Sequence, residues 1–343
     1  MPHERFMQRC LQLALQGAGS VAPNPMVGAV LVHEDRIIGE GYHQRFGGPH
    51  AEVLALRSVK VEDEYLIPEA TMYVSLEPCS HFGKTPPCAD LLIEKRVKRV
   101  VIANTEPNPV VVGRGIKKLR DAGIEVMTGV LEVEGNFLNR RFFTFHKHKR
   151  PYIILKWAQS ADGYFTQNNQ QQHWITGDLS RRLVHRWRNE EQAILVGYRT
   201  VVVDNPELTV RLWEPRHQPL RIVLDRDNTL PAASKVFNDA APTLLLSSKQ
   251  RADFPVQQLI GPWKDGLPVQ LYPILFERNI QSIIIEGGVA TLQAFIAQGL
   301  WDEVRVFTGQ THFVSGVEAP RLPIAPATTE TIGTDRLDIY YKP

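Results

Sequence analysis

A chain of 343 residues is longer than one ordinary hydrophobic core requires, so its length predicts about two domains. Hydrophobic residues make up 43% of the chain and charged residues 22%, a mixture typical of soluble globular proteins. The formal net charge of +2 gives no general case for nucleic-acid or membrane binding, and no apolar run approaches the roughly 18 residues of a membrane-spanning helix.

The expected compartment bears on the chain's three cysteines, at positions 10, 79 and 88. The first residues, MPHERFMQRC, are charged and polar and do not resemble a secretory signal, so we expect a cytoplasmic protein. Thiols stay reduced there, which disfavours a disulfide between Cys79 and Cys88. Burial as small core residues and a metal site remain as alternatives, and the polar and proline-rich surroundings of the pair favour the metal site.

The first 145 residues or so alternate helical and strand patterns. Residues 4–16 carry apolar side chains at helical spacing, which places Cys10 on a core face where packing is its expected role. The run 27–32 predicts a buried strand, and residues 36–41 return as its hairpin partner. The further predicted elements are a helix beginning near His50, a strand at 71–76, a helix at 86–97, a strand at 98–104, a helix at 115–123 and a strand at 124–130. This alternation predicts a layered α/β sandwich.

A second α/β series follows a basic and aromatic segment at 140–150. One short run of this kind is weak evidence for nucleic-acid binding, so we interpret it as a solvated connector whose aromatic side chains are packed. The predicted elements beyond it are a strand at 151–158, a helix at 178–192, strands at 193–197, 219–225 and 242–247, and a strand, Gly-Gly turn, helix and strand within 282–307. We therefore predict two domains, residues 1–147 and 148–343.

Upstream of the two cysteines, a predicted helix begins with the run His-Ala-Glu at 50–52. One imidazole and two thiolates are ligands suited to Zn²⁺ in a tetrahedral site, and three protein ligands leave one position for water, as catalytic zinc sites do. His50 and Cys88 are both predicted to lie at helix starts, where backbone N–H dipoles stabilise thiolates. Glu52 is then placed to sit beside that water. A structural zinc site closed by His81 stays open as an alternative.

Zinc deaminases carry the pattern H-x-E followed by P-C-x-x-C, with the Glu acting as acid and base rather than as a ligand. Here eight residues, rather than two, separate the cysteines. With that long spacing, the runs PHAEVLAL and LEPCSHFGKTPPC resemble the deaminase half of the bifunctional riboflavin-biosynthesis deaminase–reductases. The resemblance extends to Asn24-Pro25, Val27-Gly28, Pro107-Asn108-Pro109 and Gly113-Arg114-Gly115, whereas the family pattern has Asp where this chain has Glu106.

The resemblance implies a cytidine-deaminase-like α/β/α sandwich in which His50, Cys79 and Cys88 bind Zn²⁺. Water bound to such a metal has a pKa lowered toward ~7, and catalytic Glu52 would accept its proton and later protonate the leaving ammonia. The target is then the 2-amino group of a diaminopyrimidinone that carries a phosphoribosylamino arm. Asn24 would bind the pyrimidine, and Lys84 is either a phosphate contact or a solvated loop lysine.

In the second half, Glu286-Gly287-Gly288 lies between a predicted strand and a predicted helix. Such a turn allows a phosphate to approach the helix start, but it is common in α/β proteins and is weak evidence alone. The runs LKWAQSADG, HWITG, RTVVVDNPELTVR and LRIVLDR occur in the order found in the reductase half of the same family. That resemblance implies a dihydrofolate-reductase-like α/β domain that uses NADPH.

Residues of the reductase site follow partly from the chain itself and partly from the resemblance. Lys156 is an ionisable residue inside the predicted strand 151–158 and is either snorkelling or functional, and Asp204 interrupts an apolar run, where an ordinary turn is the alternative. We favour function, so Lys156 and Asp204 are candidates for steering protons while NADPH delivers hydride to the ribosyl C1′ and opens the sugar to a ribityl chain. Arg188 and Arg211 are fork-shaped donors suited to a phosphate. The residues implied to contact NADPH are Ala158, Trp174, Thr200, Asp204, Arg226 and Gly288. Those implied to contact the substrate are Gln172, Arg188, Leu208, Arg211 and Glu286.

Two other functions compete with this interpretation. The zinc site could act on an RNA base or a free nucleoside, which the long cysteine spacing, the weak net charge and the second half of the chain argue against. Alternatively, zinc is structural and the second half is a nucleotide-binding regulator. The favoured interpretation implies small-molecule phosphoribosylaminopyrimidine substrates, no nucleic-acid or membrane partner, and a homo-oligomer. The tail FTGQTHFVSGVEAP departs from the family pattern and carries no assigned contact.

Overall fold

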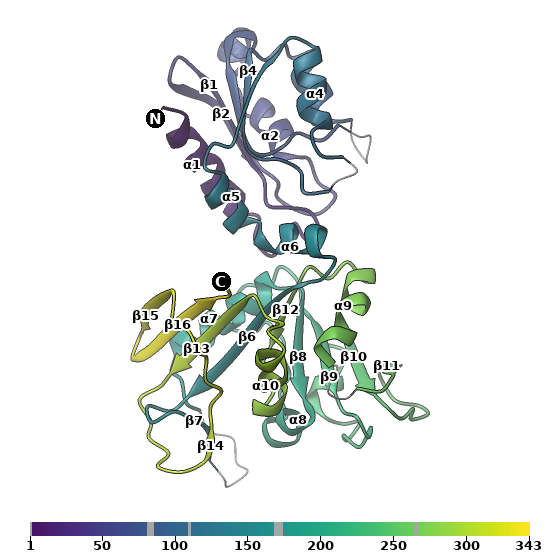
Figure 1. Ribbon diagram of the computed structural model, residues 1–343. Coiled ribbons are helices and arrows are strands. Elements are labelled where there is room, and N and C mark those ends of the chain that lie inside the picture. The colour runs from purple at the N-terminus through teal and green to yellow at the C-terminus, as the bar shows by residue number, and fades with distance from the viewer. Residues whose placement is uncertain (1, 81–85, 109–110, 168–173, 264–266) are drawn as a thin grey trace. The chain divides into compact units, whose positions relative to one another are not determined.

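The computed structural model describes residues 2–80, 86–108, 111–167, 174–263 and 267–343. The chain divides into two compact units, Met1–His148 and Lys149–Pro343, and each has its own sheet and core (Figure 1). Every helix among the described residues is too short or too polar to cross a membrane.

The first unit is a three-layer α/β/α sandwich, as the sequence predicts. Its central sheet has the order β2-β1-β3-β4-β5, in which β1 is antiparallel to β2 and β3 while β3, β4 and β5 are parallel. The elements are α1 (Pro2–Leu15), β1 (Gly28–His33), β2 (Arg36–Tyr42), α2 (Ala51–Arg57), the 3-10 helix η1 (Val61–Glu69), β3 (Thr71–Leu76), α3 (Cys88–Glu94), β4 (Arg99–Asn104), α4 (Arg114–Asp121), β5 (Glu125–Thr128), α5 (Glu132–Leu138) and α6 (Arg140–His148).

Apolar side chains at helical spacing explain how the layers of this unit pack. Phe6, Cys10 and Leu13 on α1 are buried against one face of the sheet, and Cys10 has the packing role expected of it. On the other face, α2, α3 and α4 bury small and branched residues against the same strands. A Cβ atom on Gly28 would lie 2.0 Å from the backbone oxygen of Cys10, so only glycine permits α1 to approach β1 this closely.

The predicted connector at 140–150 is largely helical, because α6 occupies most of it. Phe142, Phe143 and Phe145 on this helix are buried, so the expectation that its aromatic side chains are packed is confirmed. Its basic last turn, which ends at His148, places positive charge at the helix C-terminus, where the helix dipole favours it.

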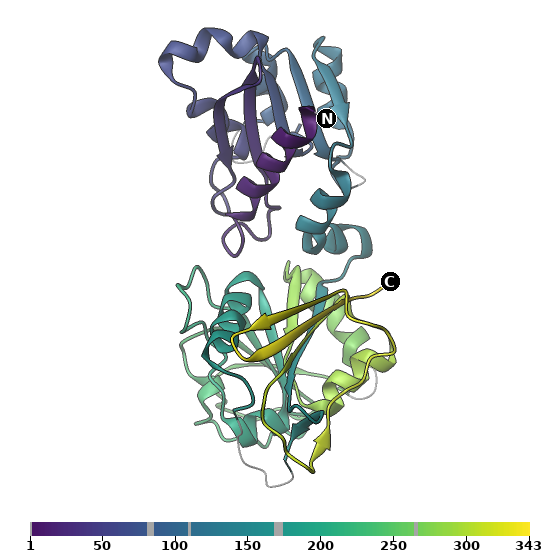
Figure 2. The same cartoon turned by 90° about the vertical axis from the view of Figure 1, so that its left-hand side faces the viewer.

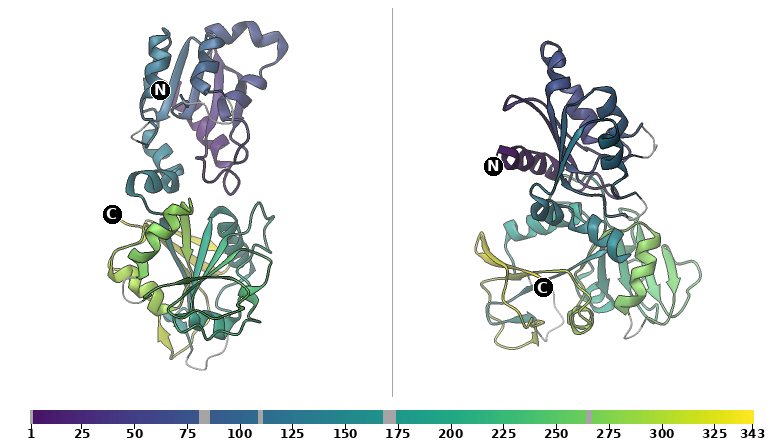
Figure 3. Two further views of the ribbon diagram at one scale, coloured as in Figure 1. Left: turned by 90° about the vertical axis from the view of Figure 1, so that its right-hand side faces the viewer. Right: turned by 45° about the horizontal axis from the view of Figure 1, so that its top comes forward.

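The second unit contains a nine-stranded sheet with helices on both faces (Figures 2 and 3). Its order is β11-β10-β9-β8-β12-β6-β13-β16-β15, parallel from β11 to β13 and closed by an antiparallel C-terminal hairpin. The elements are β6 (Tyr152–Gln159), β7 (Tyr164–Thr166), α7 (Asp178–Glu190), β8 (Ala193–Gly197), α8 (Tyr198–Asp204), β9 (Leu220–Leu224), the 3-10 helix η2 (Lys235–Phe237), β10 (Thr243–Ser247), β11 (Gln257–Ile260), α9 (Leu267–Glu277), β12 (Ser282–Ile285), α10 (Val289–Ala297), β13 (Glu303–Thr308), β14 (Val317–Glu318), β15 (Thr328–Ile332) and β16 (Asp335–Tyr341).

The parallel strands of this unit are buried on both faces. Phe295 on α10 and Leu271 on α9 belong to the largest core cluster, whereas Val184 and Trp187 on α7 pack on the opposite side of the sheet. This arrangement exposes the carboxyl ends of the parallel strands, the edge at which α/β folds bind their ligands.

Candidate active sites

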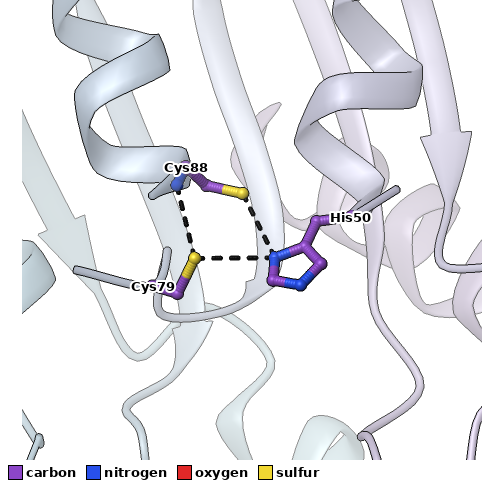
Figure 4. Close-up of side chains that lie close together, drawn as sticks. All are labelled: His50, Cys79 and Cys88. Atoms are coloured by element: carbon purple, nitrogen blue, oxygen red, sulfur yellow. Dashed lines mark hydrogen bonds between the residues drawn. The ribbon is translucent and has the colours of Figure 1, made fainter. Parts of the chain in front are cut away.

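Three potential metal ligands from separate segments meet in the first unit (Figure 4). His50 immediately precedes α2, Cys88 is the first residue of α3, and Cys79 follows β3. His50 Nδ1 lies 3.5 Å from the Cys79 sulfur and 3.3 Å from the Cys88 sulfur. All three ligand atoms lie within 4.8 Å of one another. Two of the three ligands therefore come from helix starts, as the sequence predicts.

The electrostatics of this group suit a cation that prefers nitrogen and sulfur. The Cys88 thiol donates a hydrogen bond to Cys79, and together with His50 this lowers the pKa of Cys79 to about 4 although burial opposes the change. The backbone N–H of Cys88 donates to the same sulfur at 3.3 Å. A thiolate, a second thiol and an imidazole fit Zn²⁺. His81, the alternative fourth ligand, lies outside the described residues.

Glu52 is placed to handle protons beside these ligands. It is the second residue of α2, only 3% of its surface is exposed, and its carboxyl group is within hydrogen-bonding reach of the Cys88 thiol. Burial, and then the charge of Cys79, raise the pKa of Glu52 above its ordinary value. A carboxyl group with a raised pKa is suited to general acid–base catalysis near neutral pH.

Glu77 has a role that the sequence did not reveal. Its buried carboxylate accepts four backbone hydrogen bonds, from the N–H groups of Glu106, Gly113, Gly115 and Ile116 at 3.0–3.3 Å. These bonds hold the start of α4 against the segment that leads to Cys79. A Cβ atom on Gly115 would lie 2.0 Å from the backbone oxygen of Pro78, which shows how closely the two backbones approach.

Asn24 lies in the same part of the first unit. Its amide nitrogen is 3.0 Å from His43 Nε2, and His43 Nδ1 is 2.9 Å from the backbone oxygen of Pro49, the residue before His50. A carbonyl oxygen only accepts, so His43 donates from Nδ1 and accepts the Asn24 amide at Nε2. The Asn24 amide oxygen takes no part in this hydrogen bond. Lys84, the candidate phosphate contact, lies outside the described residues.

The departure at Glu106 has a local explanation. The Glu106 carboxylate accepts the backbone N–H of Asn108 at 3.2 Å, so it closes a short turn within its own loop. Asp in this position would have a side chain one methylene shorter. Pro109, in the same family motif, lies outside the described residues.

In the second unit, sheet register brings three charged residues together. Ile285 at the end of β12 pairs with Leu155 of β6, so the next residues along, Glu286 and Lys156, are neighbours. The Lys156 ammonium is 3.9 Å from the Glu286 carboxylate, and the Arg188 guanidinium on α7 donates to the same carboxylate at 2.9 Å. The side chains are largely buried: Lys156 is 15% exposed, Glu286 10% and Arg188 12%.

Burial and neighbouring charges have opposing effects on the pKa values of this cluster. Burial would raise the pKa of Glu286, but Arg188 and Lys156 outweigh it and hold that pKa at about 2. Burial lowers the pKa of Lys156, partly offset by Glu286. Two cations therefore share one carboxylate, which leaves a positive site suited to an anionic ligand.

The segment after α8 contributes Leu208 and Arg211. Leu208 is buried and has a left-handed backbone with φ 56°, which turns the chain at this point. The Arg211 guanidinium pairs with Glu207 at 2.9 Å and donates to the Thr209 hydroxyl at 2.7 Å. The Arg211 backbone N–H donates to His185 Nδ1 on α7 at 3.0 Å. His185 was not identified from the sequence.

Several predicted cofactor residues lie at carboxyl ends of strands. Gly288 precedes α10, and a Cβ atom built on it would lie 3.9 Å from the Thr200 hydroxyl on α8, so these two residues are neighbours. Asp204 ends α8, and burial raises its pKa. Within the described residues Lys156 pairs with Glu286 and forms no ion pair with Asp204.

The remaining predicted contacts come from separate segments of the chain. Ala158 lies near the end of β6. Trp174 is 65% exposed, with the Arg181 guanidinium 4.8 Å from its ring centroid. Arg226 follows β9 and pairs with Asp227 at 3.3 Å on the surface. Gln172 lies outside the described residues.

Two family models match the chain. Residues 1–104 match the cytidine and deoxycytidylate deaminase zinc-binding region, and residues 151–316 match the RibD C-terminal domain. Among curated proteins, the riboflavin biosynthesis protein RibD of Aquifex aeolicus is 43% identical over 89% of this chain and 86% of its own length. The protein of the same name from Escherichia coli is 39% identical over 90% of this chain and 87% of its own length.

Solved structures agree over the full length. Acinetobacter baumannii RibD is 35% identical, with a TM-score of 0.90, covering 100% of this chain and 99% of that one. A diaminohydroxyphosphoribosylaminopyrimidine deaminase/5-amino-6-(5-phosphoribosylamino)uracil reductase from Thermotoga maritima is 38% identical, with a TM-score of 0.90 and the same coverage.

Proposed function

Because the chain belongs to the RibD family of bifunctional riboflavin-biosynthesis deaminase–reductases, we propose that His50, Cys79 and Cys88 hold the zinc ion of its deaminase and that Glu52 is the catalytic acid and base. The observation that carries this proposal is the convergence of one imidazole nitrogen and two sulfurs within 4.8 Å, with a buried carboxyl group beside them. A structural zinc site would not need that carboxyl group.

The protein is a zinc-dependent deaminase and an NADPH-dependent reductase of riboflavin biosynthesis. It removes the 2-amino group of 2,5-diamino-6-(5-phosphoribosylamino)pyrimidin-4(3H)-one. It then reduces the ribosyl group of the resulting 5-amino-6-(5-phosphoribosylamino)uracil to a ribityl chain. The competing interpretations, a nucleic-acid or nucleoside deaminase and a non-enzymatic regulator, do not account for the reductase half.

In the deaminase half, the chain's own residues orient the substrate and move protons. Zinc, when bound, supplies a water molecule of lowered pKa. Glu52 accepts a proton as water adds to the pyrimidine ring, and its raised pKa lets it return a proton to the departing ammonia. Asn24 binds the pyrimidine, because its amide is oriented by His43 close to His50. Glu77 holds the segment before Cys79 in place through its four backbone hydrogen bonds.

In the reductase half, NADPH supplies the hydride and the protein positions the sugar. Lys156 is buried and pairs with Glu286, and it is proposed to protonate the sugar oxygen as the ring opens. Arg188 and Arg211 are proposed to bind the substrate phosphate, since both are planar fork-shaped donors and the positive charges of both act on the same side chain, His185. Asp204 is proposed to take part in proton transfer during the reduction, and its raised pKa supports this role. The further proposed NADPH contacts are Ala158, Trp174, Thr200, Arg226 and Gly288, and the further substrate contacts are Gln172, Leu208 and Glu286.

We assign the deaminase to residues 1–147 and the reductase to residues 148–343. The two family matches and the division of the chain into two compact units support this boundary. A cytoplasmic location is proposed because Cys79 and Cys88 are free thiols, which suits a reducing compartment. Association into a homo-oligomer is proposed by analogy with the family. A sedimentation mass equal to one 38.8 kDa chain would contradict it.

Two variants test the assignment of one site to each half. Purified protein receives each substrate separately, and ammonia release and NADPH absorbance are followed. We expect Glu52→Gln to abolish ammonia release, to retain zinc by elemental analysis, and to leave NADPH oxidation intact. Lys156→Ala is expected to do the reverse and lower NADPH oxidation by roughly two orders of magnitude, the usual contribution of general acid–base catalysis. A single variant that silences both reactions contradicts the two-site assignment.

A further inference from the structure

His185 is a buried histidine that neither the metal site nor the charged cluster accounts for. It lies on α7 one turn before Arg188, and only 6% of its surface is exposed. Its Nδ1 accepts the backbone N–H of Arg211 at 3.0 Å, across 26 positions of sequence. The helix that carries one substrate-site arginine therefore holds the backbone of the other.

The hydrogen bond determines which tautomer His185 adopts. Because a backbone N–H only donates, Nδ1 carries no proton and the proton lies on Nε2. A second proton on Nδ1 would abolish the contact with Arg211. Burial, and then the positive charges of Arg188 and Arg211, keep the ring neutral by lowering the pKa of His185 to about 4. At neutral pH the contact with Arg211 is therefore maintained.

A second buried side chain on α7 provides an internal comparison. Asn189, one turn beyond His185 and 2% exposed, accepts the backbone N–H of Arg216 at 2.7 Å. Both side chains fasten the segment after α8 to the same helix, each through one backbone N–H group. Only the His185 bond lies at the residue whose guanidinium is proposed to bind substrate.

We propose that His185 is a positioning residue of the reductase: its Nδ1 fixes the backbone of Arg211 so that the guanidinium groups of Arg211 and Arg188 face one phosphate of the substrate. This inference rests on the proposed role of the two arginines. His185 acts through Arg211 and does not itself take part in hydride transfer. Its loss therefore weakens binding of the phosphorylated substrate and leaves the chemical step and the NADPH site unchanged.

The test compares two amides that differ by one methylene. Asn places its Oδ1 close to the position of Nδ1, whereas Gln places its oxygen near that of Nε2. We expect His185→Gln to raise KM for 5-amino-6-(5-phosphoribosylamino)uracil about tenfold, which is the change in affinity that the loss of about one hydrogen bond produces. Its kcat should stay within about twofold of wild type. His185→Asn should keep KM within about twofold. The Kd for NADPH, from quenching of tryptophan fluorescence, should be unchanged in both and so shows that the half is folded.

Asn189→Leu is the matched control, because it removes one acceptor of a backbone N–H from the same helix and segment. An Asn189→Leu rise in KM equal to that of His185→Gln overturns the proposal, since any loosening of the segment would then suffice. Equal KM values for His185→Asn and His185→Gln overturn it as well. A loss of NADPH binding in both His185 variants also overturns it. Arg211→Ala separates the premise from the inference. If Arg211→Ala leaves KM unchanged, the proposed phosphate binding by Arg211 is wrong. If Arg211→Ala raises KM while His185→Gln does not, only the positioning role of His185 is wrong.

Discussion

At the scale of single residues, burial and neighbouring charges together decide which charges the reductase half carries. Glu286 stays ionised with a pKa of about 2 because Arg188 and Lys156 outweigh its burial, whereas His185 stays neutral because burial, and then the charges of Arg188 and Arg211, lower its pKa to about 4. Both residues are almost fully buried, so their protonation states are linked to folding. This charge state, two cations around one carboxylate, is suited to the anionic substrate proposed to bind there.

His185 gives the free energy of unfolding a specific pH dependence. Its folded pKa of about 4 lies below the ordinary 6.5, because burial and the charges of Arg188, Arg211 and Lys156 outweigh the attraction of Glu286. Between these pH values the unfolded chain binds a proton that the folded chain does not, so stability is full above pH 6.5 and falls as the pH drops toward 4. From pH 7 to pH 5 the loss due to His185 alone should be about 2 kcal/mol.

Urea unfolding followed by tryptophan fluorescence measures this loss in the reductase half, since all six tryptophans lie beyond residue 149. Other groups titrate in the same window, so the relevant quantity is the difference between wild type and His185→Asn. We expect wild type to lose about 2 kcal/mol more than the variant between pH 7 and pH 5. Parallel stability curves for the two proteins would contradict the prediction.

The zinc ligands could be predicted from sequence because their chemistry is carried by side-chain identity and spacing. His50, Cys79 and Cys88 meet in the structure as that spacing indicated. Glu77 and His185 could not be predicted in this way. Each binds backbone N–H groups of a distant segment, which every residue possesses, and so leaves no pattern of side chains to detect.

At the scale of secondary-structure elements, strands and helices with clear periodicity were predicted within a few residues. Three other elements, α8, α9 and β15, were not predicted from the sequence. Helix α8 contains the run Val201–Val203, whose β-branched residues favour a strand. Helix α9 contains Pro273, which ordinarily ends a helix. The edge strand β15 is largely exposed and polar, so it lacks a buried face that would create an alternating pattern. Tertiary packing overrides local preference in α8 and α9, whereas β15 forms by pairing with β16.

A buried arginine shows how such elements are joined. Arg221 is the second residue of β9 with 0% of its surface exposed, and burial lowers its pKa to about 10, so it remains charged at neutral pH. Its guanidinium donates to the side chains of Thr243 and Asn238 and to the backbone oxygens of Glu207, Asn238 and Ala241. One side chain thus satisfies acceptors that no regular strand pairing reaches.

Arg221→Met should therefore destabilise the reductase half by about 3 kcal/mol, because the apolar side chain fills the space but removes the donor from the buried backbone oxygen of Ala241 and from the other acceptors of this network. Tryptophan fluorescence during urea unfolding reports this change. The control is Arg278→Met: Arg278 is exposed and donates to the backbone oxygen of Ile274 at 3.3 Å, and its loss should change stability by less than about 0.5 kcal/mol. Equal effects of the two substitutions would show that the Arg221 network contributes nothing specific.

At the scale of the whole molecule, two compact units each contain a sheet, a core and a reactive centre. No residue proposed for the deaminase lies beyond His148, and none proposed for the reductase lies before it. If the proposed residues carry the two reactions, each set lies within one unit, and we expect neither reaction to require a residue of the other.

This separation predicts that two inactive halves on different molecules complement each other. Given the diaminopyrimidine substrate and NADPH, Glu52→Gln alone should oxidise no NADPH, because its reductase receives no substrate, and Lys156→Ala alone should release ammonia with little NADPH oxidation. An equimolar mixture should oxidise NADPH after a lag, as the deaminated intermediate leaves one molecule and reaches the other. Supplying that intermediate directly to Glu52→Gln provides the control and should remove the lag. A mixture no more active than Lys156→Ala by itself, with this control fully active, would mean that the intermediate passes between the halves without release.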